Sequence, residues 1–385
     1  MLTERLEFAP DRDAEVFSAV PAAPAVFLLR GSDTRAEPYV SKTANLRRRL
    51  QRLLGPVEAR TKKLNLRDRV REIEYAPTGS DFESGFLLYS VLRAQFPKTY
   101  SDRMRFRFAP LVKLHLENEY PRASITTRLG RLGGRSLYYG PFVSRVAAEK
   151  FMNDSLDFFK MRRCVDDLHP DPKFPGCIYS EMKMCLAPCF KGCTDEEYAA
   201  EVKRVQAYFD SAGESLAREL SAERESASAR LAFEDAAAIH ARAEKLKPVL
   251  SQLPEIVQRL DRFSALMIQP SHIAGSVTFF RVECGRISGP IPFGVQSAEH
   301  AKSQSMESRV QQALDFPSAK TKGALETMEH LALLKRWYYR GSRMGEIFFA
   351  DAKGELPMRR IVRGISRVFR GEKPEVEATN APGSP

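Results

Sequence analysis

The chain has 385 residues, so we expect two to four compact units rather than a single core. Six cysteines are too few for a disulfide scaffold, and no apolar stretch approaches the ~18–20 residues needed to cross a bilayer. The charged N-terminus lacks a secretory segment, so we expect a cytoplasmic protein with no membrane partner. The formal net charge of +11 favours a polyanionic partner such as DNA, although the charge could be incidental.

The first predicted unit mixes short strands with basic helices. Ser80 and Glu83 have the spacing of a capping box, which predicts that a helix begins here and ends before Pro97. Short apolar or alternating runs predict strands in front of it. We expect strands over residues 25–29, 38–40 and 71–77, and a helix over residues 45–54.

The rest of the chain divides by composition. Residues 101–200 contain strand-like runs and then a loop rich in cysteine and proline. Residues 201–255 are helical, with a break expected at Gly213. Residues 256–375 return to strands and then helices, and residues 376–385 predict a disordered tail.

Five of the six cysteines are clustered, in the order Cys164-x12-Cys177-x7-Cys185-x3-Cys189 with Cys193 behind them. Four thiolates can hold a [4Fe–4S] cluster or a zinc ion. Only Cys185 and Cys189 form the close pair typical of zinc sites, and a proline-containing loop can wrap around a bulky group. The residues therefore favour a cluster slightly over zinc, and Cys193 could compete as a ligand.

Two segments concentrate positive charge. Both could contact phosphates, and both could instead be solvated helix surfaces. The first contains Lys42, Arg47, Arg48, Arg49, Arg52, Lys62, Lys63, Arg67, Arg69 and Arg71, and the second, a helix predicted over residues 358–373, contains Arg359, Arg360, Arg363, Arg367 and Arg370 spaced to form one face.

The helical segment ARLAFEDAAAIHARAEKL contains apolar residues that one helix cannot bury. Leu231 and Phe233 need either a second helix of the same chain or another protein to cover them. The sequence leaves both possibilities open.

These motifs together resemble the N-terminal two-thirds of UvrC, the incision subunit of bacterial nucleotide excision repair. Residues 24–27 (PAVF) and 39–49 (YVSKTANLRRR) are similar to the P-G-V-Y and Y-V-G-K-A-x-N-L-R-x-R motifs of its GIY-YIG nuclease domain. PLVKL, PRASITTR, YYGPF and the spaced cysteines follow in the order of the family. The resemblance covers roughly residues 15–300, and we expect the family's RNase H-like and helix-hairpin-helix domains to be absent.

The resemblance implies an α+β multidomain fold. It implies a small GIY-YIG-like α/β domain at residues 16–100, and linker strands with a cysteine-rich Fe–S region at 101–200. A UVR helical hairpin at 201–255 and a C-terminal α/β segment at 256–375 would follow. In that family the four cysteines bind a [4Fe–4S] cluster and the UVR hairpin docks onto the helicase subunit UvrB. The implied cluster ligands are Cys164, Cys177, Cys185 and Cys189, and the implied partner-binding residues are Leu231, Phe233, Glu234, Ala236 and Ala237.

The same resemblance implies a nuclease site with two departures. Tyr39, Arg49 and Lys42 occupy catalytic positions of the family. The tyrosine of the first motif falls on Phe27, which lacks the hydroxyl, and the metal-binding glutamate falls on Leu88, which binds no metal. We therefore expect a degenerate site, with Mg²⁺ or Mn²⁺ bound only if the nuclease is active.

Three functions remain open at this stage. The first is a UvrC-like repair protein that binds DNA and a UvrB-type partner and cleaves weakly or not at all. The second is an active 3′-side incising endonuclease in which Glu83, Glu72 or Glu74 replaces the metal ligand. The third is an Fe–S-stabilised protein scaffold without DNA cleavage.

Overall fold

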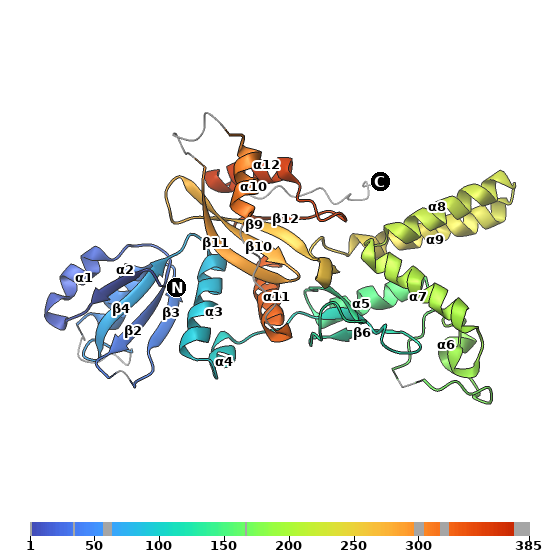
Figure 1. Cartoon of the computed structure of the whole chain (residues 1–385), viewed down its shortest axis with the longest axis horizontal. Coiled ribbons are helices and arrows are strands. Elements are labelled where there is room, and N and C mark those ends of the chain that lie inside the picture. The colour runs from blue at the N-terminus through green and yellow to red at the C-terminus, as the bar shows by residue number, and fades with distance from the viewer. Residues whose placement is uncertain are drawn as a thin grey trace.

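The computed structural model describes residues 2–33, 35–56, 64–165, 168–295, 304–315 and 323–372. Within these residues the chain forms three four-stranded sheets, joined and covered by helices (Figure 1). This confirms a mixed α and β fold with several units. Lys62, Lys63 and the tail at 376–385 lie outside the described residues. No helix of the described chain is long and apolar enough to span a membrane.

The N-terminal unit is an antiparallel sheet between helices, with the strand order β1-β4-β2-β3. Side chains alternate along β2, so that Phe27 and Leu29 face α1 and α2 while Val26 and Leu28 face α3. The elements are β1 (Glu4–Glu7), η1 (Pro10–Arg12), α1 (Asp13–Ala19), β2 (Ala25–Gly31), β3 (Tyr39–Thr43), α2 (Leu46–Leu54), β4 (Val70–Pro77) and α3 (Asp81–Gln95).

Side-chain caps begin both long helices of this unit. Asn45 accepts a hydrogen bond from the N–H of Arg48 in front of α2. Ser80 accepts one from the N–H of Glu83 at 3.1 Å, and the Glu83 carboxylate accepts one from the N–H of Gly79 at 2.8 Å. The predicted cap of α3 is therefore confirmed, and its last residue precedes Pro97.

The middle unit is built around a sheet with the strand order β6-β5-β7-β8. Its last strand comes from beyond the helical hairpin, so the chain leaves this unit and returns to it. The elements are α4 (Tyr100–Met104), β5 (Leu111–Leu114), β6 (Ala123–Thr126), β7 (Leu137–Gly140), α5 (Arg145–Leu156), α6 (Ile178–Glu181), η2 (Pro188–Phe190), α7 (Asp195–Asp210), β8 (Gln258–Arg259) and η3 (Leu260–Arg262).

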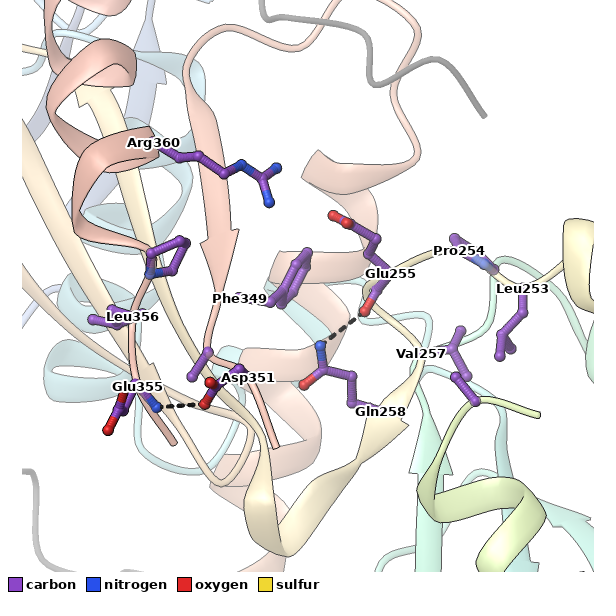
Figure 2. Close-up of a pocket in the computed structure, with 13 residues that line it drawn as sticks. Leu253, Pro254, Glu255, Val257, Gln258, Phe349, Asp351, Glu355, Leu356 and Arg360 are labelled. Carbon is purple, nitrogen blue, oxygen red and sulfur yellow. Dashed lines mark hydrogen bonds between the residues drawn. The ribbon is translucent and has the colours of Figure 1, made fainter. Parts of the chain in front are cut away.

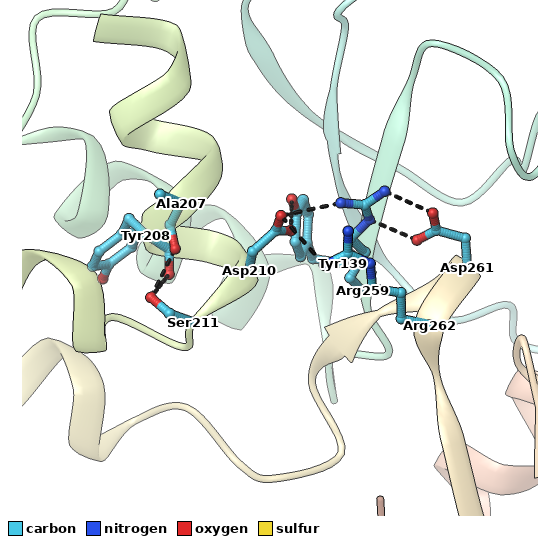
Figure 3. Close-up of polar contacts among 8 residues, drawn as sticks. All are labelled: Tyr139, Ala207, Tyr208, Asp210, Ser211, Arg259, Asp261 and Arg262. Carbon is cyan, nitrogen blue, oxygen red and sulfur yellow. Dashed lines mark hydrogen bonds and ion pairs between the residues drawn. The ribbon is translucent and has the colours of Figure 1, made fainter. Parts of the chain in front are cut away.

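A polar network fixes the point where the chain returns (Figure 3). Asp210 at the end of α7 accepts hydrogen bonds from the Tyr139 hydroxyl at 2.7 Å and from Arg259 at 3.0 Å. The guanidinium of Arg259 also donates two bonds to Asp261. Paired, bidentate geometry is the strong form of such contacts, so β7, α7 and β8 are held together at the base of the hairpin.

The hairpin consists of α8 (Glu214–Ala229) and α9 (Phe233–Ser251), and it extends away from the body of the molecule (Figure 1). Its seam is buried, with Leu220 from α8 and Leu246 from α9 among the residues that fill it. Gly213 breaks the chain before α8, as predicted: its φ is +93°, and a Cβ would lie 2.1 Å from the Leu250 side chain.

The C-terminal unit is an antiparallel sheet with the strand order β11-β10-β9-β12. Phe279 faces α10 and α12, whereas its neighbour Phe280 faces α11 and α3. The elements are β9 (Ser264–Pro270), β10 (Ser276–Glu283), β11 (Arg286–Gly294), α10 (Met306–Leu314), α11 (Ala324–Tyr338), β12 (Glu346–Phe349) and α12 (Met358–Arg370).

Helix α3 joins the first and last units, because it is packed on both sides. One side faces Val26 and Leu28 of the N-terminal sheet. The other side meets the C-terminal unit, where the Phe82 ring lies edge-on to Phe280 with centroids 5.0 Å apart. The Tyr89 hydroxyl donates to the buried carboxylate of Glu329 on α11 at 2.7 Å. Helix α3 therefore bridges the hydrophobic clusters of the two units.

Candidate functional site

The structure brings together three of the predicted nuclease positions on the face of the sheet that α1 and α2 cover. Arg49 on α2 donates a hydrogen bond to the hydroxyl of Tyr39 on β3 at 2.8 Å. The Phe27 ring is fully buried beside them, 6.1 Å from the Tyr39 ring between centroids. A tyrosine at position 27 would need a hydrogen-bond partner in this apolar site.

Lys42 and Leu88 lie on the opposite face of the same sheet. Tyr39 and Lys42 are three positions apart on β3, so their side chains point to opposite sides. Leu88 packs with Val26 and Val40 on the α3 side, and Lys42 pairs with Asp81 at 2.5 Å. The predicted catalytic set is thus divided by the sheet.

The carboxylates that could have replaced the metal ligand have other partners. Glu83 is buried and caps α3, and burial raises its pKa although the bond from the Gly79 N–H opposes this. Glu74 pairs with Arg30 at 2.9 Å, and Glu72 pairs with Arg5. Among the described residues, no group of three or more His, Cys, Asp or Glu side chains could hold a metal ion.

A large cavity of about 600 Å³ lies elsewhere, between the base of the hairpin and the C-terminal unit (Figure 2). Glu255 and Gln258 line one side of it, and Phe349 and Asp351 line the other. It contains none of the predicted nuclease, cluster or partner-binding residues.

The four predicted cluster ligands are all partly buried, and Cys164, Cys177 and Cys189 lie near enough to Cys185 to affect its charge. Burial raises the pKa of the Cys185 thiol to about 11, and negative charge on Cys164, Cys189 and Cys177 raises it further. Negative charge on Cys189 contributes to the raised pKa of Cys193, whereas Cys193 is not among the groups that shift the pKa of Cys185. Four thiols are the donor type that iron–sulfur clusters take, and no three of these side chains form a metal-ion site among the described residues.

The backbone between these cysteines is held in an unusual conformation. Lys183, Ala187 and Lys191 all have φ near +56° to +59°, a left-handed region that side chains other than glycine rarely adopt. Each lies within two residues of a cysteine. Such strain gathers at functional sites. The N–H of Ala187 also donates to the Cys185 sulfur at 3.3 Å.

Helices α8 and α9 cover each other along the hairpin, but its tip remains uncovered. Leu231 and Phe233 are 72% and 67% exposed. Glu234 and Ala237 are also exposed, and Ala236 is half-buried. The two helices therefore form a hairpin within the chain, but this hairpin does not bury Leu231 and Phe233.

The basic segments are only partly free to meet a ligand. Arg47 donates to the carbonyls of Val20 and Ser18, and Arg67 pairs with Asp13. On α12, Arg367 donates two bonds to Glu346, so the predicted single basic face is wrong for this residue. Arg359, Arg363 and Arg370 stay on one exposed face, since helix positions four and seven apart lie together.

Comparison with known proteins identifies relatives for about two-thirds of the chain. Residues 110–208 match the family model of the UvrC/Cho excinuclease middle domain. Proteins named UvrABC system protein C are similar: that of Rickettsia bellii is 27% identical over 265 residues, which cover 68% of this chain and 41% of the relative. That of Carboxydothermus hydrogenoformans is 29% identical over 60% of this chain and 38% of the relative.

A third protein of the same name, from Methanothermobacter thermautotrophicus, is 26% identical over 71% of this chain and 45% of its own length. The chain thus spans about 40% of the length of the curated relatives that it matches. No solved structure matches the chain. The sequence similarity shows a UvrC-like protein.

Proposed function

We propose that this UvrC-like chain acts in nucleotide excision repair, where it binds DNA and binds a UvrB-type partner through its helical hairpin. Its nuclease domain no longer cleaves efficiently. The main reason to propose weak cleavage is the position of Leu88. It lies in the apolar contact between α3 and the N-terminal sheet, where the family has its metal-binding glutamate. Loss of a catalytic group commonly slows a reaction by ~10²–10⁴-fold.

The exposed arginines of α12 support DNA binding. Arg359 and Arg363 have no carboxylate partner within the described residues, and they lie on the same side of the helix. Helix α12 is anchored on the C-terminal sheet by Ile361 and Ile365 on its other side. A rigid row of cations suits the regular phosphates of a nucleic-acid backbone.

The hairpin tip supports partner binding. Leu231 and Phe233 are large apolar side chains exposed side by side at the end of a projecting element. Apolar anchors of this kind carry most of the energy of many protein interfaces. Because the seam of the hairpin is already filled, the tip is free to enter a groove on another protein.

The cysteine region supports a bound [4Fe–4S] cluster held by Cys164, Cys177, Cys185 and Cys189. When bound, the cluster would link the loop covalently to iron and so supply structural stability. Purification without oxygen, followed by iron and sulfide analysis and visible absorption, tests this. We expect Cys185→Ser to lose the cluster and the isolated Cys284→Ser to keep it. Equal iron content in the two variants would contradict the ligand set.

An incision assay tests the central proposal. Anaerobically prepared protein is incubated with Mg²⁺ or Mn²⁺ and a UV-damaged duplex, with and without UvrA and UvrB. We expect binding without a nick. The control pair is Arg49→Ala and Arg48→Ala, since Arg49 holds Tyr39 and Arg48 is an exposed neighbour. A metal-dependent nick that only Arg49→Ala abolishes would show an active site and overturn the proposal.

A further inference from the structure

A second cavity, of about 230 Å³, lies on the α3 side of the N-terminal sheet, where α11 of the C-terminal unit closes over it. It is therefore formed by segments more than two hundred residues apart in the sequence. The lining residues come from β3 (Lys42), α3 (Asp81, Phe82, Gly85 and Leu88), α4 (Arg103 and Met104), α11 (Leu333, Arg336 and Trp337) and the turn after α11 (Arg340).

Positive charge surrounds this cavity. Lys42, Arg336 and Arg340 belong to the lining, together with Arg103, which also pairs with Glu37. Asp81 is the single carboxylate of the lining, and it pairs with Lys42 at 2.5 Å and with Arg340 at 2.7 Å. Arg336 is exposed and has no carboxylate partner in the part of the chain that the structure describes.

The interior of the cavity is apolar. Phe82, Leu333 and Trp337 are each less than a tenth exposed, whereas the charged groups lie toward solvent. The Trp337 indole N–H is already used, since it donates to the Met344 carbonyl at 3.0 Å. An anion at the mouth would therefore meet several cations beside a wall of low polarity, where charge interactions are stronger than in open water.

We propose that this cavity binds one phosphate of a nucleic-acid backbone, held by Lys42, Arg336 and Arg340, and that Asp81 competes with that phosphate for the same cations. The volume is below the ~300–1,000 Å³ typical of sites that enclose a whole small molecule, which favours one unit of a polymer. The inference rests on the DNA binding proposed above and names a place where it occurs.

Because Asp81 competes with the phosphate for the same cations, removing its charge and removing the cations should change DNA affinity in opposite directions. Replacing Asp81 by Asn leaves Lys42 and Arg340 unpaired, so DNA affinity should rise severalfold. Asp102→Asn is the matched control, because Asp102 is an exposed carboxylate on the nearby helix α4 that does not line the cavity. A general effect of charge would raise the affinity of both variants equally.

Removing cations should have the reverse effect. The double variant Arg336→Ala/Arg340→Ala should bind DNA about tenfold more weakly, as expected for lost charge-assisted hydrogen bonds. The slope of log affinity against log salt should fall by about 1. Arg224→Ala/Arg230→Ala, on the exposed hairpin, removes the same charge away from the cavity.

Trp337 makes the test direct, because it is the only tryptophan of the chain and it lines the cavity. Single-stranded and duplex DNA are titrated into the full chain while anisotropy of labelled DNA and tryptophan fluorescence are followed together. We expect both signals to change at the same DNA concentration. Inorganic phosphate is titrated separately, and a fluorescence change at equal phosphate concentration would show a free-phosphate site instead.

The other outcomes are distinct. If anisotropy shows DNA binding but the fluorescence and the cavity variants behave like the parent protein and the controls, DNA binds elsewhere and only the cavity proposal fails. If neither single-stranded nor duplex DNA binds at low salt, both this proposal and the proposed DNA-binding function fail.

Discussion

The guanidinium of Arg49 donates a hydrogen bond to the hydroxyl of Tyr39 at 2.8 Å, next to the buried ring of Phe27. The bond joins α2 to β3, which is an edge strand of the N-terminal sheet. Two positions that were predicted from the sequence to be catalytic therefore hold the unit together. This structural contribution persists whether or not the domain cleaves DNA.

Tyr39→Phe should consequently lower stability by about 1 kcal/mol, the usual net value of one hydrogen bond between partly buried groups. Chemical denaturation of the full chain measures the change. Tyr179→Phe is the control, because its hydroxyl has no hydrogen bond among the described residues. Equal stabilities of the two variants would show that the Arg49 contact contributes nothing to folding.

Glu83→Gln should change how stability depends on pH. Burial raises the pKa of Glu83, so the folded protein holds its proton more tightly than the unfolded chain does. This stabilising contribution is complete below the unfolded pKa and is lost as the pH rises through the folded pKa. The free energy of unfolding of the parent minus that of the variant should therefore fall between mildly acidic and neutral pH.

Denaturation of the parent and the Glu83→Gln variant at several pH values measures this difference. The contributions of the other titrating groups are the same in both proteins and therefore cancel. Gln retains an oxygen that can accept the bond from the Gly79 N–H. A difference that stays constant with pH would contradict the assigned shift. A loss of Mg²⁺ or Mn²⁺ binding in the variant would instead indicate that Glu83 is a metal ligand.

Phe233→Ser should leave folding intact and weaken partner binding by at least tenfold, because the side chain is 67% exposed and sits at the hairpin tip. Titration calorimetry with purified UvrB measures the affinity. Leu325→Ser is the matched control, since Leu325 is a 58% exposed apolar residue at the start of α11. If both variants lost UvrB affinity equally, the loss would come from placing serine on the surface in general and would not identify the hairpin tip as the binding site.

Gly364→Ala and Gly85→Ala should have opposite effects on stability. A Cβ at Gly364 would lie 2.3 Å from the Phe348 ring, which is buried under α12, so we expect a loss of about 1–3 kcal/mol. A Cβ at Gly85 on α3 meets nothing within 4 Å, so alanine should add roughly 0.5–1 kcal/mol. Thermal unfolding compares the two, and equal shifts would show that α12 can move away from the sheet.

Features set by neighbouring residues were predictable from the sequence. Ser80 and Glu83 form the expected cap, and the alternation of apolar residues places the strands of the first and last units close to their predicted positions. Gly213 ends α7 because its conformation is open to glycine and costly for other residues. Such signals lie within a few positions of one another.

Features that join distant segments were not predictable in this way. Strand β12 carries only four residues, and β8 only two, so neither has a measurable period. The break between α8 and α9 falls at Leu231, where φ is +58° without a glycine to signal it. Arg340 and Asp81 are 259 positions apart, so no pattern of neighbouring residues predicts their ion pair.

The packing of α3 on both sides has a consequence for any carboxylate placed at position 88. A glutamate at position 88 would face Lys42, Arg336 and Arg340 across the small cavity, and these cations would compete with a divalent ion for its carboxylate. A single substitution at this position would therefore not create a divalent-metal site. Such a site would also need α11 to move away from α3, so the joint between the first and last units limits what this face of the sheet can bind.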